Sequence, residues 1–211
     1  MRNTKKFYRY YKTKKGTFIK FPFFISYFIT DPDLVGYKPT IFRRNLIQIL
    51  KTHKVDMICF RDKTTPQTLP LIKIFLQIAR KFKIKQIYIN SHINIAHKYN
   101  FDGVHLTSKQ FNTISKAKDL KLSTIISCHT TKEIQKAKNS KIDFITYSPI
   151  FYKENKGTPK GIDNLAKIVQ KYQTNRFGIV ALGGIITSNH IQQIQQTYTS
   201  GFASIRYFIV K

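Results

Sequence analysis

The sequence predicts an α/β protein built as a closed (β/α)8 TIM barrel. Two observations lead to this fold class. Eight short apolar runs alternate with amphipathic segments, and polar residues follow the ends of the runs, where parallel α/β folds bind their ligands. The alternative is an open doubly wound sheet. Such a sheet usually carries a glycine-rich turn after its first strand, where this chain has Asp31-Pro32-Asp33.

The clearest strand–helix–strand unit lies between Lys85 and Leu106. An apolar strand ends at Asn90, a short helix is expected over Ile93–Tyr99, and a second apolar strand contains His105 near its end. Strands joined by such a right-handed crossover are parallel. This unit therefore predicts a parallel sheet with polar side chains at the strand ends.

The other elements repeat this alternation along the chain. Apolar runs typical of strands occur at Phe24–Thr30, Val55–Phe60, Gln86–Asn90, Gly103–Leu106, Leu122–Ser127, Phe144–Ser148, Phe177–Leu182 and Gly201–Tyr207. Amphipathic segments that predict further helices occur at Ile41–Thr52, Leu69–Phe82, Lys109–Lys118, Lys132–Lys138, Ile162–Tyr172 and Asn189–Thr197.

The end of the chain departs from a complete barrel. It stops at Lys211, a few residues after the last predicted strand, so the final helix is expected to be missing. Without that helix, Phe202, Ile205 and Phe208 are expected to be partly exposed. A partner subunit or the N-terminal arm folding back can cover these residues. Exposed apolar patches usually mark interfaces, which favours a homo-oligomer.

Composition limits the class of protein. A chain of 211 residues can form one sizeable core, and no linker divides it. No apolar run is long enough to span a bilayer, and the N-terminus lacks a signal-peptide core, so we expect a cytoplasmic protein without a membrane partner. Cys59 and Cys128 lie in or beside predicted strands and are expected to be reduced thiols.

The charge of the chain indicates an anionic partner. The formal net charge is +27, from 37 basic and 10 acidic residues. Lysines occur on nearly every predicted helix, so nucleic acid is a poorer candidate than a small phosphorylated molecule. A basic, tyrosine-rich segment precedes Phe21, with a basic cluster over Arg2–Lys20, and either adds an element at the barrel floor or forms a mobile tail. We therefore divide the chain into a basic N-terminal extension, residues 1–22, and a barrel, residues 23–211.

The predicted strand ends carry groups that suit anions. Arg61 and Lys63 follow the second strand, and Gly183-Gly184 follows the seventh, just before a helix. Paired glycines let backbone N–H groups approach a phosphate closely, and the loops after strands seven and eight commonly form the phosphate site of such barrels. A simple tight turn is the alternative role for the glycines.

Several short motifs, in order, resemble the thiamine phosphate synthase/TenI family over about residues 24–206. They are Ile29-Thr30-Asp31, Arg61-Asp62-Lys63, Ile89-Asn90, Asp102-Gly103-Val104-His105-Leu106, Ser127-Cys128-His129-Thr130, Pro149-Ile150-Phe151, Lys156 and Ala181-Leu182-Gly183-Gly184-Ile185. The resemblance implies a (β/α)8 fold and a place in thiamine biosynthesis. In the synthase, a pyrimidine pyrophosphate ionises and a thiazole phosphate captures the carbocation. In TenI-like members, a histidine moves a proton to aromatise a thiazole carboxylate phosphate.

The resemblance also implies roles for individual residues. The diphosphate-binding residues correspond to Arg61, Lys63, Asn90 and Lys156, and Ser127 belongs to the substrate site. The thiazole-phosphate site corresponds to Gly183, Gly184 and the backbone around Ile205-Arg206. The histidine that acts as acid and base in TenI-like members corresponds to His129, so His129 and Lys156 are the candidate catalytic residues.

The chain differs from the synthase pattern where that pattern binds metal. The two aspartates that hold Mg²⁺ in the synthase correspond to Ser91 and Gln110, and a glutamine two positions before Arg61 is replaced by Cys59. Neither serine nor glutamine supplies the anionic oxygen that Mg²⁺ prefers. Mg²⁺ is therefore expected as a cofactor only if the chain is a synthase.

Three functions remain open. A TenI-like tautomerase acting on a thiazole phosphate is slightly favoured. A synthase that joins pyrimidine pyrophosphate and thiazole phosphate with a rebuilt metal site comes next. A non-catalytic binder of such phosphates, or of nucleic acid, is third.

Some residues have simpler alternative roles. Arg61 and Lys63 can be solvated cations, and His129 can be a structural histidine in the turn after strand five. His105 is expected to serve packing, and a zinc site of His92, His105 and His129 lacks a characteristic ligand spacing. Cys128 and His129 are adjacent and point to opposite faces of a strand, so they are not expected to form a nucleophile pair.

Overall fold

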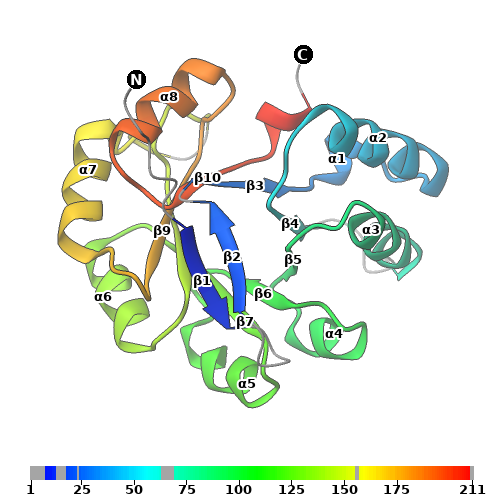
Figure 1. Ribbon diagram of the computed structural model, residues 1–211, viewed down its shortest axis with the longest axis horizontal. Helices are drawn as coiled ribbons and strands as arrows, with labels where there is room; N and C mark the ends of the chain where they lie inside the picture. The colour runs from blue at the N-terminus through cyan, green and yellow to red at the C-terminus, as the bar shows by residue number, and fades with distance from the viewer. Residues whose placement is uncertain (1–7, 13–17, 23, 63–68, 155–156, 210–211) are drawn as a thin grey trace.

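The protein is a closed barrel of eight parallel strands. The computed structural model describes residues 8–12, 18–22, 24–62, 69–154 and 157–209. The barrel strands lie in the order β10-β3-β4-β5-β6-β7-β8-β9, and β10 pairs in parallel with β3 to close the ring. Figure 1 shows the helices arranged around the outside of this ring in chain order. The predicted TIM barrel is therefore confirmed.

The observed elements match the predicted alternation closely. The barrel strands are β3 (Ile25–Ile29), β4 (Met57–Phe60), β5 (Gln86–Asn90), β6 (Gly103–Leu106), β7 (Ser123–Cys128), β8 (Phe144–Tyr147), β9 (Gly178–Leu182) and β10 (Gly201–Ser204). The helices are α1 (Pro32–Val35), α2 (Pro39–Thr52), α3 (Leu69–Lys81), α4 (Ile93–Lys98), α5 (Ile114–Asp119), α6 (Thr131–Asn139), α7 (Gly161–Tyr172) and α8 (Ser188–Gln196), with 3-10 turns at η1 (Phe111–Thr113) and η2 (Arg206–Phe208).

Side chains alternate between the inside of the barrel and the helix layer. In β3, Tyr27 belongs to the inner cluster and Phe28 packs in the outer one. Cys59 is buried inside the ring and Cys128 is buried outside it, and both are free thiols. This alternation follows from the period of two residues in a strand. It also places Cys128 in the layer between the strands and the helices, away from the barrel interior.

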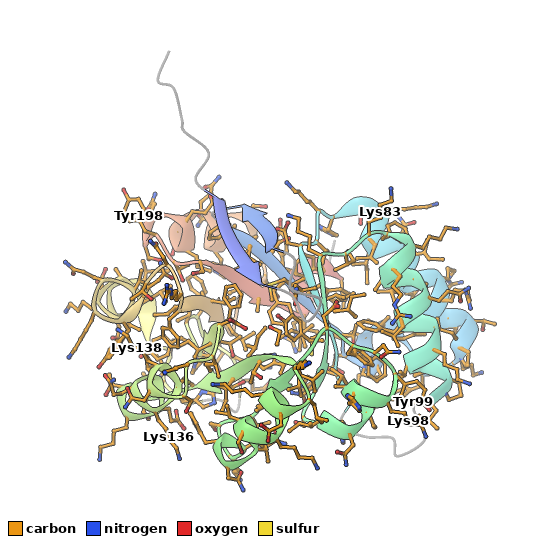
Figure 2. All side chains as sticks on the ribbon, turned by 60° about the horizontal axis from the view of Figure 1, so that its bottom comes forward. Lys83, Lys98, Tyr99, Lys136, Lys138 and Tyr198 are labelled. Atoms are coloured by element: carbon orange, nitrogen blue, oxygen red, sulfur yellow. The ribbon has the colours of Figure 1, made fainter. Side chains whose placement is uncertain are left out.

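Two antiparallel strands precede the barrel. They are β1 (Tyr8–Lys12) and β2 (Phe18–Pro22), and Tyr8 lies opposite Pro22 in their register. In the views of Figures 1 and 2 this pair lies over one end of the barrel. Since β3 starts shortly after β2, that end is the one where the barrel strands begin. The N-terminal segment thus adds a β-hairpin next to the barrel floor.

The C-terminal end corrects one expectation. The last strand stops at Ser204, and among the described residues it is followed by the short 3-10 turn η2 in place of an α-helix. Phe208 stacks on Phe202 with ring centroids 5.8 Å apart, and Phe24 stacks on Phe202 from the other side. Phe202 and Phe208 are only 4% and 3% exposed, and Ile205 is half-buried. The predicted exposure is wrong for Phe202 and Phe208, whereas Ile205 is partly exposed. The homo-oligomer prediction therefore loses most of the apolar patch on which it rested.

The outer surface carries basic side chains on many elements. Figure 2 shows Lys83, Lys98, Lys136 and Lys138 projecting from different sides of the barrel. Positive charge spread in this way attracts polyanions without selecting a sequence. In the part of the chain that the structure describes, no helix is both long enough and apolar enough to cross a bilayer.

Candidate functional site

A cavity of about 440 Å³ opens at the carboxyl end of the barrel. It is lined by residues that follow β3, β8, β9 and β10. Four residues that the sequence assigns to a phosphate site meet there: Gly183, Gly184, Ile205 and Arg206. The cavity therefore coincides with the predicted phosphate position of the barrel.

The paired glycines shape the wall of this cavity. Gly183 and Gly184 have φ angles of +98° and +72°, a region that side chains rarely adopt. A Cβ on Gly184 would lie 2.5 Å from the carbonyl oxygen of Tyr152, and one on Gly183 would lie 2.8 Å from Cα of Pro149. The glycines thus let the loop after β8 pack directly on the loop after β9. The Phe151 N–H donates to the Gly183 carbonyl across this contact, at 3.0 Å.

The loop after β10 is tied to the loop after β9. The Ser204 hydroxyl donates to the Ile185 carbonyl at 2.7 Å, and the Tyr207 N–H donates to Ser204 Oγ at 3.1 Å. Arg206 is exposed next to this connection and adds a cation to the cavity. Backbone groups and a guanidinium converging on one cavity suit a phosphate.

Arg61 lies at the rim but does not line the cavity. Its Nη1 is 3.0 Å from Oδ2 of Asp31, and both side chains are about four-fifths buried, with exposed fractions of 21% and 23%. The Arg61 N–H donates to the Thr30 hydroxyl at 3.0 Å. The cation is thus oriented by groups at the end of the neighbouring strand.

Asn90 ends β5, and its amide supports the backbone next to it. Its Nδ2 donates to the His105 carbonyl at 2.9 Å, which leaves its side-chain oxygen without a partner among the described residues. Lys63 and Lys156, two other predicted diphosphate-binding residues, lie outside the described residues. Lys153, earlier in the loop after β8, does line the cavity.

The positions that correspond to the metal aspartates do not suit Mg²⁺. The Gln110 side-chain oxygen accepts from the N–H and the hydroxyl of Thr107, at 3.0 and 3.1 Å. Its amide nitrogen donates to the Ser91 carbonyl at 3.2 Å. The glutamine therefore connects two loops, and it offers neither a charge nor a free oxygen to a hard cation.

His129 lies directly after β7, exposed at the carboxyl end of the barrel. Its Nδ1 is 3.1 Å from the Ser148 carbonyl. The same Nδ1 lies 3.3 Å from the Ser148 hydroxyl oxygen. When Nδ1 carries the proton, it donates to the Ser148 carbonyl and the lone pair of the neutral ring is on Nε2. The His129 and Thr130 N–H groups both donate to Glu133, whose side chain completes the capping box of α6. With the proton on Nδ1, the acceptor atom of the His129 ring is Nε2.

Ser127 connects the site to a buried polar network. Its Oγ is 3.1 Å from His105 Nε2 and 3.3 Å from the Thr146 hydroxyl. On the other side of the ring, His105 Nδ1 is 3.0 Å from the Tyr27 hydroxyl. Burial, with a smaller effect of the Arg61 charge, lowers the pKa of His105 to about 3. His105 thus has the packing role expected of it, as a neutral ring with both nitrogens in contact.

Neither the histidines nor the cysteines form the other sites considered. Among the described residues, no three histidine, cysteine or acidic side chains come together as a metal site, so the trio of His92, His105 and His129 is not formed. Burial raises the pKa of the Cys59 thiol to about 12 and also raises that of Cys128. Neither thiol is a nucleophile in this state.

The sequence analysis missed several residues at the cavity. Asp31 was given no role beyond a turn and a family motif, and Asp33 none beyond the turn, but both line the cavity and Asp31 caps α1. Tyr152 and Glu154 also line it. A matching signal existed in the sequence, because Asp31 and Arg61 follow neighbouring strands at the same distance from the strand ends.

Comparisons with known proteins agree with this architecture. The family model for thiamine monophosphate synthase matches residues 26–208, which is most of the chain. The chain belongs to this family. A thiamine-phosphate synthase from Latilactobacillus sakei subsp. sakei is 32% identical over 178 residues, which cover 77% of each chain. A putative thiamine-phosphate synthase 2 from Aquifex aeolicus is 29% identical and covers 87% of this chain and 96% of its own length.

A solved structure gives the same result for the fold. The thiamine phosphate pyrophosphorylase from Pyrococcus furiosus aligns with a TM-score of 0.72 at 22% identity, over 87% of this chain and 86% of that chain. At this identity the likeness concerns the fold alone. Membership of the thiamine monophosphate synthase family makes the chain an enzyme of thiamine biosynthesis.

Proposed function

We propose that this enzyme acts on a phosphorylated thiazole and catalyses a tautomerase-type proton transfer, as TenI-like members do. The observation that carries this choice is Gln110. Gln110 stands where the resemblance places a metal-binding aspartate of the synthase. Its amide bonds to Thr107 and to the Ser91 carbonyl, so at this position the side chain connects two loops. Proton transfer needs no pyrophosphate to leave and hence no cation at that position.

The remaining residues fit this reaction. The phosphate would bind the backbone of Gly183-Gly184 and the region of Ile205-Arg206, which line one cavity. His129 would take a proton from the thiazole ring system through Nε2 and return it to another carbon, so the composition of the substrate is unchanged. In this reaction Nδ1 would carry a proton donated to the Ser148 carbonyl, 3.1 Å away, and Nε2 would be the accepting atom. Ser127, Asn90 and Arg61 would hold the rest of the ligand, and Lys63 and Lys156 are proposed to add charge.

The second candidate is thiamine-phosphate synthase. It is favoured by the names of the relatives, several of which are thiamine-phosphate synthases. In that reaction a pyrimidine pyrophosphate loses pyrophosphate and the thiazole nitrogen takes its place. Arg61 and the lysines would have to offset the charge of the leaving group. Any Mg²⁺ would have to bind without a carboxylate at the positions of Ser91 and Gln110.

One pair of assays separates the two reactions. The purified protein is given a thiazole carboxylate phosphate tautomer, and separately pyrimidine pyrophosphate with thiazole phosphate, each with Mg²⁺ or with a chelator. We expect isomerisation that the chelator does not change. Thiamine phosphate formation that depends on Mg²⁺ would assign the synthase reaction instead.

The role of His129 is tested by His129→Asn. Asparagine still donates a hydrogen bond but cannot act as a base near neutral pH. We expect isomerisation to fall by about 10²–10⁴-fold, with phosphate binding retained. Unchanged turnover would remove His129 from the mechanism, and an absence of turnover in the wild type for both reactions would favour a non-catalytic binder.

A further inference from the structure

Asp31 and Arg61 meet because the strands that they follow are in register. Ile29 of β3 lies opposite Cys59 of β4, and the Thr30 N–H donates to the Cys59 carbonyl at 2.9 Å. Continuing this register two residues beyond the Ile29–Cys59 pair brings Asp31 opposite Arg61. Their side chains form the ion pair at 3.0 Å. The pair is thus a direct product of barrel geometry.

The Asp31 carboxylate is held on both sides. Its Oδ1 accepts from the Asp33 N–H at 3.3 Å and caps α1, while Oδ2 receives Arg61 Nη1. Arg61 is fixed at a second point, because its N–H donates to the Thr30 hydroxyl. Two consecutive residues of one strand end therefore hold both the backbone and the guanidinium of Arg61.

The guanidinium keeps donors for a ligand. Arginine has five N–H donors in a planar fork, and among the described residues only Nη1 has a partner. The charge is felt inside the barrel, because it adds to the effect of burial in lowering the pKa of His105. A cation held in one orientation loses less freedom when it binds an anion than a mobile one does.

We propose that Asp31 is a positioning residue that holds the Arg61 guanidinium in the orientation that binds an anionic oxygen group of the ligand. This inference rests on the proposed function, in which Arg61 contacts the ligand. The group is a carboxylate in the tautomerase reaction or a diphosphate in the synthase reaction. Both present oxygens to the same planar fork.

The test is a double-mutant cycle on binding. Wild type, Asp31→Asn, Arg61→Gln and the double variant are titrated calorimetrically with inorganic pyrophosphate and, separately, with thiazole carboxylate phosphate. Asparagine keeps the shape of Asp31 and an oxygen for the helix cap, while the charge is removed and the oxygen that accepts from Arg61 becomes an NH2 donor. We expect the single variant Asp31→Asn to bind the titrant about fivefold more weakly than wild type. The double variant is expected to bind it with the same affinity as Arg61→Gln alone. The titrant that loses affinity in Arg61→Gln identifies the anionic group.

Asp33→Asn is the matched control. It removes the same charge from the same cavity, two residues away and without contacting Arg61. Loss of repulsion is expected to leave binding equal or tighter in this variant. Melting temperatures of all variants verify that they are folded.

The results distinguish a failure of the positioning role of Asp31 from a failure of the proposed function. If Asp31→Asn binds as tightly as wild type, or weakens binding equally in the Arg61→Gln background, the positioning role is overturned and the proposed function stands. If wild type binds neither titrant, the proposed function and this inference both fail.

Discussion

The buried His105 ring makes a sharp prediction about acid stability. Burial holds the folded-state pKa of this imidazole at about 3, against an ordinary value of 6.5. Between these values the unfolded chain binds a proton at this position and the folded chain does not. Stability from this group is therefore complete above pH 6.5 and is lost as the pH falls toward 3.

The size of the effect follows from proton linkage. One proton of difference changes the free energy of unfolding by about 1.4 kcal/mol per pH unit, so His105 alone removes about 3 kcal/mol between pH 6.5 and pH 4. The carboxylates titrate in the same range, and a variant is needed to isolate the histidine. In His105→Gln the amide can bond Tyr27 or Ser127 but does not titrate.

The assay is urea unfolding of both proteins at several pH values from 7.5 to 4. At pH 7.5, His105→Gln is expected to be less stable by about 1–3 kcal/mol, because one of the two hydroxyls loses its partner. The difference in unfolding free energy between the two proteins should shrink or reverse as the pH falls. Only wild type loses stability through protonation of His105 in the unfolded chain. Parallel curves down to pH 4 would refute the reasoning, since they would mean that His105 takes up its proton in the folded barrel.

Two further substitutions test the site and the barrel end. Gly184→Ala is expected to reduce the affinity for the thiazole phosphate at least tenfold and to lower the melting temperature. The reason is that the new Cβ would lie 2.5 Å from the Tyr152 carbonyl oxygen. An affinity equal to that of wild type would show that the loop after β8 can move to make room for the methyl group. Phe208→Ala is expected to cost about 3 kcal/mol in urea unfolding, because a ring that packs on Phe202 is removed. Tyr198→Ala, at a residue that is 71% exposed, serves as its control. An equally small loss of unfolding free energy in both variants would contradict the role of η2 in covering Phe202.

Local sequence patterns were sufficient for much of the fold. Apolar runs in β5 and β6 begin and end at the predicted residues, because buried strands need continuous apolar side chains. The alternation rule also placed Cys128 correctly relative to His129. The glycine pair was predicted as a phosphate loop, and in the structure its backbone lines a cavity.

Contacts between distant segments were harder to predict. The run Gly201–Tyr207 was predicted as one strand, yet β10 ends at Ser204, and Phe208 turns back to stack on Phe202. The Gln110 amide was seen only as a missing carboxylate. Its bonds with Thr107 lie within one loop, but its bond to the Ser91 carbonyl depends on how the loops after β5 and β6 approach each other, which no local pattern describes.

The sequence by itself determined the ring of strands, the face that each strand side chain takes and the end of the barrel where polar groups gather. These depend on short-range periodicity and on the handedness of the crossover, which act within each strand–helix unit. Only the tertiary structure decided which polar groups meet. Strand register brought Asp31 to Arg61, and the close approach of two loops directed the His129 ring through the Ser148 carbonyl. Such contacts are set by the closure of the whole ring, because closure alone fixes how far each strand end lies from its neighbour.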